Sequence, residues 1–209
     1  MFFQGWTLRV RAASRAPAPL LLMIHGWTGD ENSMWVFTRG LSPDYWIVAP
    51  RAPFAAQPAG YSWRPAQPGG HAWPTFEDLQ PGVQKLLSLA DAYAAENELD
   101  AGQLDLMGFS QGAALVTALA LVHPQRVRRA AVLAGFVPQG ADALSDARPL
   151  KGKPFFVAHG TQDERVPIQH AHAAVKVLEA AGAHVTYCED NVAHKLGLRC
   201  LREMESFFA

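Results

Sequence analysis

In Leu104-Asp105-Leu106-Met107-Gly108-Phe109-Ser110-Gln111-Gly112-Ala113, a short, mostly apolar run leads through a serine into a second apolar run. A nucleophilic serine in such a motif lies in a strained turn between a strand and a helix, so both flanking positions must lack a Cβ atom. The helix that begins there directs its N-terminus at the serine and stabilises negative charge. A chance match is the alternative, but the strand and helix patterns on either side favour Ser110 as a nucleophile.

Outward from this stretch, short apolar runs alternate with amphipathic segments. Most of the predicted strands lack polar alternation, which is typical of strands buried on both faces; they span residues 4–11, 20–25, 46–49, 104–108, 130–134, 154–159 and 184–188. Helices are predicted over residues 33–39, 75–98, 111–123, 168–181 and 199–208. This alternation predicts one domain over residues 1–209, a three-layer α/β sandwich whose mostly parallel sheet of about seven strands has helices on both faces and no separate cap domain.

A serine is a weak nucleophile near neutral pH and needs a base that a third group orients. On this topology the acid and then the base follow later strands. Asp163 lies after the strand at 154–159 and before a helix, and it is the predicted acid. Glu164 would point elsewhere from the adjacent position, and Asp142 and Asp146 lie in a polar loop after the preceding strand.

The base must be chosen among eight histidines. His194 alone follows the last predicted strand and precedes the last helix, so it is the predicted base. His71 lies upstream of the serine in a long loop, and His170 and His172 come too early in the chain order.

The oxyanion of an acyl-transfer intermediate needs two backbone N–H donors. Gln111, directly after the nucleophile, is predicted to supply one. Trp27, in the loop after the early strand at 20–25, is predicted to supply the other, and its ring can also be core packing.

Aromatic residues gather in a long loop over residues 50–74, which is predicted to lack regular structure and to contribute to a pocket. The predicted substrate-binding residues are Tyr61, Trp63, Trp73, Phe136 and Val166. The open alternative is that they simply anchor the loop to the core. With no cap domain, the site is expected to be open and to favour short or medium acyl chains.

Composition limits the remaining classes of function. The net charge of −1 without a basic block argues against nucleic acid or an anionic membrane as the main partner. No phosphate loop, nicotinamide fingerprint or metal-ligand cluster is present in the sequence, so no cofactor and no metal are expected. Neither a signal peptide nor a membrane span is predicted. Cys188 and Cys200 are expected to be buried free thiols, which favours a reduced, cytoplasmic setting.

Four motifs in this order resemble the phospholipase/carboxylesterase family of α/β-hydrolases. They are residues 22–26 (LMIHG), 108–112 (GFSQG), 159–163 (HGTQD) with Val166-Pro167, and 193–197 (AHKLG). The resemblance runs from about residue 20 to the C-terminus. It implies the α/β-hydrolase fold and a cofactor-free, monomeric or homodimeric enzyme that cleaves carboxylic esters and sometimes thioesters.

The resemblance leaves the substrate open. The chain is more similar to the small bacterial carboxylesterases than to the acyl-protein thioesterases, which usually have a second glycine where this chain has Ala113. Dienelactone hydrolases, a related family, use cysteine where this chain has Ser110. A carboxylesterase acting on a small-molecule ester is the leading hypothesis. A thioesterase or lysophospholipase for longer acyl chains, and a non-catalytic binding protein, are the alternatives.

Overall fold

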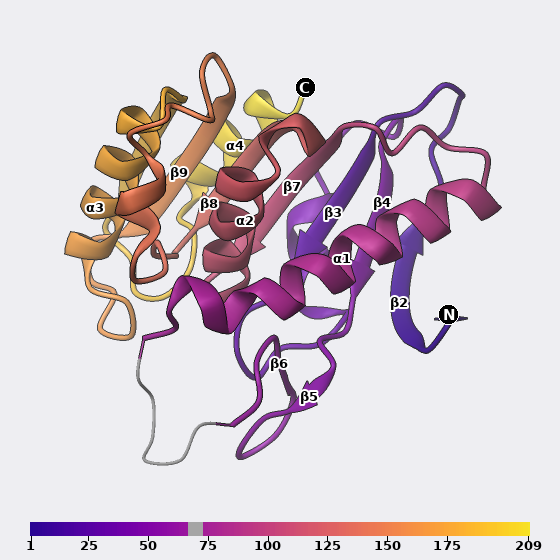
Figure 1. Ribbon diagram of the computed structural model, residues 1–209, viewed down its shortest axis with the longest axis horizontal. Coiled ribbons are helices and arrows are strands. Elements are labelled where there is room, and N and C mark those ends of the chain that lie inside the picture. The colour runs from indigo at the N-terminus through magenta and orange to yellow at the C-terminus, as the bar shows by residue number, and fades with distance from the viewer. Residues whose placement is uncertain (67–72) are drawn as a thin grey trace.

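A single eight-stranded sheet forms the centre of the computed structural model, which describes residues 1–66 and 73–209 (Figure 1). In order across the sheet the strands are β1 (Phe2–Phe3), β2 (Trp6–Arg11), β4 (Trp46–Pro50), β3 (Leu20–Ile24), β7 (Leu104–Phe109), β8 (Val127–Leu133), β9 (Pro154–Gly160) and β10 (His184–Asp190). The pairs β1–β2 and β2–β4 are antiparallel, and every pair from β4 to β10 is parallel. The predicted mostly parallel sheet is confirmed, with eight strands rather than about seven.

The helices begin and end at residues with clear local causes. The α-helices are α1 (Phe76–Glu96), α2 (Gln111–Val122), α3 (Ile168–Ala180) and α4 (Leu198–Phe207), and the short 3₁₀ helices are η1 (Ser33–Thr38), η2 (Pro124–Arg126) and η3 (Ala141–Leu144). Thr75 and Asp78 form a capping box at the start of α1. Pro124 follows α2 and cannot continue it. Pro167 precedes α3, and Gly182 follows it at a φ of +92°.

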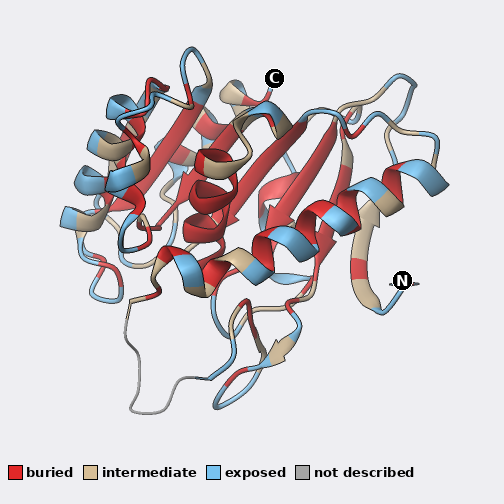
Figure 2. Cartoon of the chain, in the orientation of Figure 1, coloured by how far each residue is buried: buried red, intermediate tan, exposed pale blue. Residues whose placement is uncertain are grey.

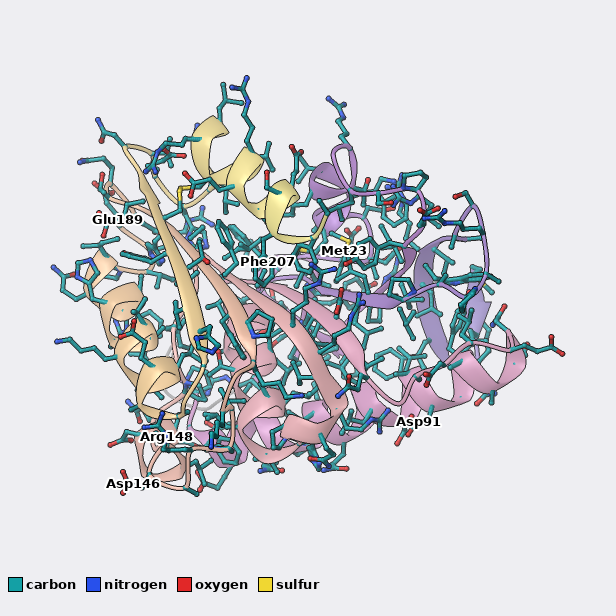
Figure 3. The ribbon with its side chains drawn as sticks, turned by 90° about the horizontal axis from the view of Figure 1, so that it is seen from above. Met23, Asp91, Asp146, Arg148, Glu189 and Phe207 are labelled. Atoms are coloured by element: carbon teal, nitrogen blue, oxygen red, sulfur yellow. A yellow bond between two sulfur atoms is a disulfide. The ribbon has the colours of Figure 1, made fainter. Side chains whose placement is uncertain are left out.

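Helices cover both faces of the sheet, as predicted. Alternate side chains of β3 enter two separate apolar clusters: Leu20, Leu22 and Ile24 pack with residues of α1, α2 and α3, while Leu21 and Met23 pack with residues of η1 and α4. Figure 3 shows α4 on one side of the sheet and α1, α2 and α3 on the other. The strands between these layers are mostly buried (Figure 2), so the sheet is a rigid platform for the loops at its carboxyl edge.

Two predictions about local structure are corrected. The strand predicted over residues 4–11 is present as β2 but begins at Trp6, because Gln4 and Gly5 adopt φ values of +43° and +87° and turn the chain between β1 and β2. The loop at 50–74 contains a small hairpin of β5 (Phe54–Ala55) and β6 (Tyr61–Ser62), which lies beyond the end of β4 (Figure 1). Residues 67–72, including the rejected candidate His71, lie outside the described residues.

The prediction of two free thiols was also wrong, because Cys188 of β10 and Cys200 of α4 form a disulfide. Helix α4 packs on β10 and brings the two Cα atoms to 5.6 Å, within the range that a disulfide spans. Both cysteines are buried. Figure 3 shows the yellow bond near Glu189. The cytoplasmic setting, which rested on free thiols, stays a prediction without that support.

Candidate active site

Ser110 lies in a sharp turn between β7 and α2, at a φ of +54° and a ψ of −115°. Its N–H donates a hydrogen bond of 2.9 Å to the carbonyl of Leu133 at the end of β8. A Cβ atom on Gly108 would lie 2.3 Å from the carbonyl oxygen of Gly112, and one on Gly112 would lie 2.1 Å from that of Ile24. Only glycine fits at either position, which confirms the steric reason predicted for both glycines.

The predicted acid and base are hydrogen-bonded to each other across two loops. Nδ1 of His194 lies 2.7 Å from Oδ2 of Asp163. Because a carboxylate only accepts, Nδ1 donates this bond, and the neutral ring keeps its free lone pair on Nε2. The other carboxylate oxygen of Asp163 accepts the N–H groups of Arg165 and Val166, each at 3.0 Å. The carboxylate is fully buried and the imidazole is 14% exposed, so the ring bridges a buried anion and the surface.

A second histidine, His159 at the end of β9, contacts the same carboxylate. Its Nε2 lies 2.7 Å from the carbonyl of Val166 and 3.3 Å from Oδ2 of Asp163, so Nε2 bears the proton. The side chain is buried, and burial lowers the pKa of His159. Its Nδ1 is buried without a hydrogen-bond partner among the described residues. A neutral His159 therefore helps to hold Asp163 without adding a positive charge, a contact that the sequence did not predict.

Ser110 and His194 line one pocket of about 520 Å³. The ring of His194 packs 4.9 Å from that of Phe109, the residue before the serine. Among the described residues no hydrogen bond joins the Ser110 hydroxyl to the His194 ring. Such bonds are often long without substrate and shorten only in the complex. The other apolar walls come from the loop after β3 with η1, from the segment leading into α4 and from α4 itself: Trp27, Met34, Val36, Phe37, Leu196 and Leu201.

The loop with Trp27 lies directly against the serine. A Cβ atom on Gly26 would be 3.1 Å from Cβ of Ser110. The loop is fixed by backbone bonds of 3.0 Å from the N–H of Gly29 to the carbonyl of Gly26 and from the N–H of Thr28 to the carbonyl of Tyr61. Trp27 is 41% exposed and lines the pocket.

Gln111, the other predicted donor, is the first residue of α2, and the first N–H groups of a helix have no partner within it. Its side chain is occupied elsewhere, because Oε1 accepts the N–H of Trp63 at 3.1 Å. The backbone N–H of Gln111 lies in the first turn of α2, directly after Ser110, which lines the pocket. The role of both predicted donors in an oxyanion hole stays a prediction.

Comparison with known proteins shows the family of the chain. The family model described as Phospholipase/Carboxylesterase matches residues 7–209. The chain belongs to the phospholipase/carboxylesterase family. It is thus a hydrolase of the carboxylesterase and acyl-protein thioesterase type, with the α/β-hydrolase fold.

Individual relatives cover much of the chain. Acyl-protein thioesterase 1 of Kluyveromyces lactis is 31% identical over 186 residues, which are 81% of this chain and 81% of that protein. A probable inactive carboxylesterase of Oryza sativa is 30% identical over 126 residues, 58% of this chain and 48% of its own length. The crystal structure of the Bacillus cereus carboxylesterase has a TM-score of 0.84 at 21% identity and covers 98% of this chain and 94% of its own; it shows the shared fold.

None of the five aromatic or apolar residues predicted to bind substrate lines the pocket that contains Ser110 and His194. Trp63 is 1% exposed, and its indole N–H donates to the carbonyl of His25 at 2.8 Å. Tyr61 fixes the Trp27 loop through its backbone, and its hydroxyl accepts from Arg51. Trp63 and Tyr61 therefore fit the alternative interpretation, in which the aromatic residues anchor the loop to the core.

Trp73 and Phe136 form a separate aromatic cluster with His170. The ring of Trp73 lies 4.6 Å from that of Phe136 and 4.2 Å from that of His170. Val166 is buried in the core beside Asp163. The other residues that line the pocket were missed, although one signal was available: Phe109 and Lys195 directly adjoin Ser110 and His194 in sequence.

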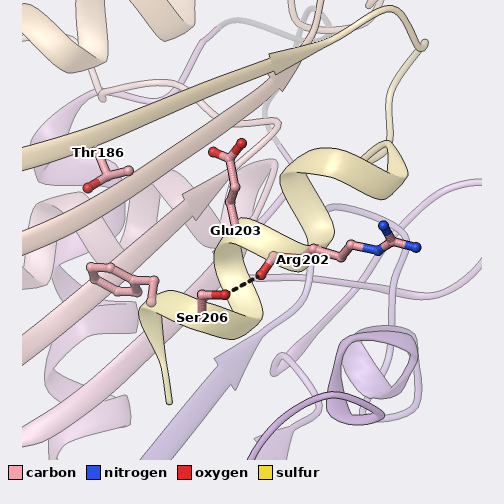
Figure 4. A pocket seen from close by; sticks show the side chains of 5 residues that line it. Thr186, Arg202, Glu203 and Ser206 are labelled. Atoms are coloured by element: carbon pink, nitrogen blue, oxygen red, sulfur yellow. Dashed lines mark hydrogen bonds between the residues drawn. The ribbon is translucent and has the colours of Figure 1, made fainter.

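A second depression lies between β10 and α4, lined by Thr186, Arg202, Glu203, Ser206 and Phe207 (Figure 4). Its Ser206 hydroxyl donates to the carbonyl of Arg202 one turn earlier. No residue of the predicted site lines it, and its described lining has no histidine that could act as a base. In the described residues, no three His, Cys, Asp or Glu side chains cluster to hold a metal, and no helix has the length and apolar character to cross a membrane.

Proposed function

We propose that this chain is a serine carboxylesterase that hydrolyses short- to medium-chain esters through an acyl-enzyme intermediate. The proposal rests above all on the 2.7 Å bond between Asp163 and Nδ1 of His194. That bond leaves the Nε2 lone pair available in a pocket that also contains Ser110 in its strained turn.

In this mechanism Nε2 of His194 takes the proton of the Ser110 hydroxyl as the oxygen attacks the ester carbonyl. Asp163 holds the ring tautomer and stabilises the imidazolium that forms. The N–H groups of Gln111 and Trp27 bind the oxyanion. His194 then returns the proton to the leaving alcohol, and water repeats the two steps on the acyl-enzyme.

Hydrolysis of p-nitrophenyl butyrate by the purified protein tests this proposal when it is compared with the Ser110→Ala variant. The wild-type protein should turn the ester over, and the variant should lose nearly all activity while it keeps its thermal unfolding midpoint. Ser145→Ala, a change at a buried serine outside the pocket, is the matched control and should remain active. Equal turnover by wild type and Ser110→Ala would refute Ser110 as the nucleophile.

A thioesterase for longer acyl chains is the second candidate. The 31% identity with acyl-protein thioesterase 1 over most of both chains favours it, as do the apolar walls of the pocket. Rates on p-nitrophenyl esters of increasing chain length decide between the two. A maximum at short or medium acyl chains supports the carboxylesterase, whereas a rate that still rises at long chains supports the thioesterase.

A further inference from the structure

Among the residues that the structure describes, the charged side chains that line the pocket with Ser110 are both positive. Apart from the titratable ring of His194, its ionisable lining residues are Arg165 and Lys195. The whole chain has a net charge of −1, so the positive charge at the pocket is opposite in sign to the net charge of the protein. Such a bias within a partly enclosed apolar cavity attracts anions more strongly than the same charges on an open surface.

The two cationic residues lie close in sequence to the predicted acid and base. Arg165 follows Asp163 by two positions, and its backbone N–H is bonded to that carboxylate at 3.0 Å. Lys195 directly follows His194, and its N–H donates to the carbonyl of Ala193 at 2.7 Å. Fixed backbones thus place both flexible side chains beside the reacting groups rather than at a remote part of the surface.

Neither side chain forms an ion pair with the part of the chain that the structure describes. Among the described residues, no carboxylate lies within 4.0 Å of the charged group of Arg165 or Lys195. By contrast, Arg51 is paired with Glu31, and Arg64 with Asp78.

Acidic residues close by in sequence do not line the pocket. Glu164 is exposed and lies outside the lining. Asp30, after the Trp27 loop, is bonded to Asn32 and Ser33. Among the described residues, the two cations therefore line the pocket without a carboxylate beside them in that lining.

We propose that Arg165 and Lys195 make this pocket selective for esters that bear a carboxylate in addition to the scissile bond. The flat guanidinium of arginine matches a planar carboxylate through two parallel hydrogen bonds, and the lysine ammonium adds a second cation. The apolar walls from Met34, Phe37 and Leu201 accept the hydrocarbon part of the same molecule. The inference rests on the proposed esterase function and names the class of its substrate.

Two matched ester pairs test the selectivity. The first places the charge on the acyl side: mono-p-nitrophenyl adipate against p-nitrophenyl hexanoate. The second places it on the alcohol side: the butyrate ester of para-hydroxybenzoate against that of methyl para-hydroxybenzoate. For each pair the readout is the ratio of kcat/KM for the charged ester to kcat/KM for the neutral one, which cancels general losses of activity.

In the wild type this ratio should exceed one for at least one pair and fall as salt is added, because exposed charges are screened. Arg165→Ala and Lys195→Ala should each lower it about fivefold, the upper end for an exposed ion pair, and the double variant about 20-fold. Lys176→Ala on α3, an exposed lysine outside the pocket, is the matched control and should leave the ratio unchanged.

The two possible failures are distinguishable. Turnover of all four esters with ratios that the double variant does not change would overturn the charge selectivity and leave the esterase intact. No turnover of any of the four esters by the wild type would contradict the esterase function and this inference with it.

Discussion

Removing the disulfide between Cys188 and Cys200 should destabilise the fold around the predicted base. The bond closes a loop across a sequence separation of 12 residues, and His194 lies inside that loop. For a loop of this length, cross-linking is worth about 3 kcal/mol in chain entropy lost from the unfolded state. In a chain of 209 residues this corresponds to a fall in Tm of about 6–12 °C.

The assay is thermal and urea unfolding of the wild type and of the double variant Cys188→Ala/Cys200→Ala, each with and without a reductant. The wild type should lose stability on reduction, and the double variant should be less stable from the start and insensitive to the reductant. Esterase activity of the variant should fall at a lower temperature than that of the oxidised wild type. Equal midpoints for all four samples would show that the disulfide contributes nothing to stability in solution and would contradict the prediction.

Three further changes test other parts of the structure. Gly108→Ala places a Cβ atom 2.3 Å from the carbonyl oxygen of Gly112 and should cost about 3 kcal/mol, the upper end for overpacking, in urea unfolding; a cost near zero contradicts the steric argument. Asp163→Asn should lower kcat about 10⁴-fold in ester hydrolysis with the fold intact, because the imidazole of His194 is then no longer held in the tautomer that keeps its lone pair on Nε2. A loss of only tenfold would contradict the role of Asp163. Burial lowers the pKa of His25 and His159, so the folded state binds fewer protons than the unfolded one below about pH 6.5. Stability should be full above that pH and fall below it, by up to about 1.4 kcal/mol per pH unit and histidine, with a smaller slope in His25→Gln; an unfolding free energy that is flat with pH would contradict this.

The central sheet could be predicted because its strands are buried on both faces. Residues 20–24 and 104–107 are nearly continuous apolar runs, and glycines or prolines mark the ends of the helices that follow. The β5–β6 hairpin could not be predicted in this way. Its strands have two residues each, and β6 is held by pairing with Gly29, a contact far away in sequence.

The disulfide depends on packing that no spacing rule encodes. Cys188 and Cys200 become neighbours only because α4 folds back on β10 after the loop with His194. Two cysteines separated by 12 residues are compatible with many folds in which the thiols lie too far apart to form a disulfide.

The predicted acid and base lie together because chain order after parallel strands fixes position at one edge of the sheet. Asp163 and His194 follow β9 and β10, which are neighbours in the sheet, and this pairing brings their side chains into hydrogen-bond distance. The pocket walls follow no such rule. Trp63 has an aromatic ring suited to a binding site, but its indole N–H is satisfied in the core by His25.

The most direct test of the central claim is covalent labelling with a fluorophosphonate, followed by mass spectrometry of the labelled peptides. We expect a single adduct on Ser110 that forms rapidly in the wild type, slowly in His194→Ala and not at all in Ser110→Ala. An unlabelled wild-type protein, or an adduct on another residue that persists in Ser110→Ala, would contradict the assignment of Ser110 as the nucleophile.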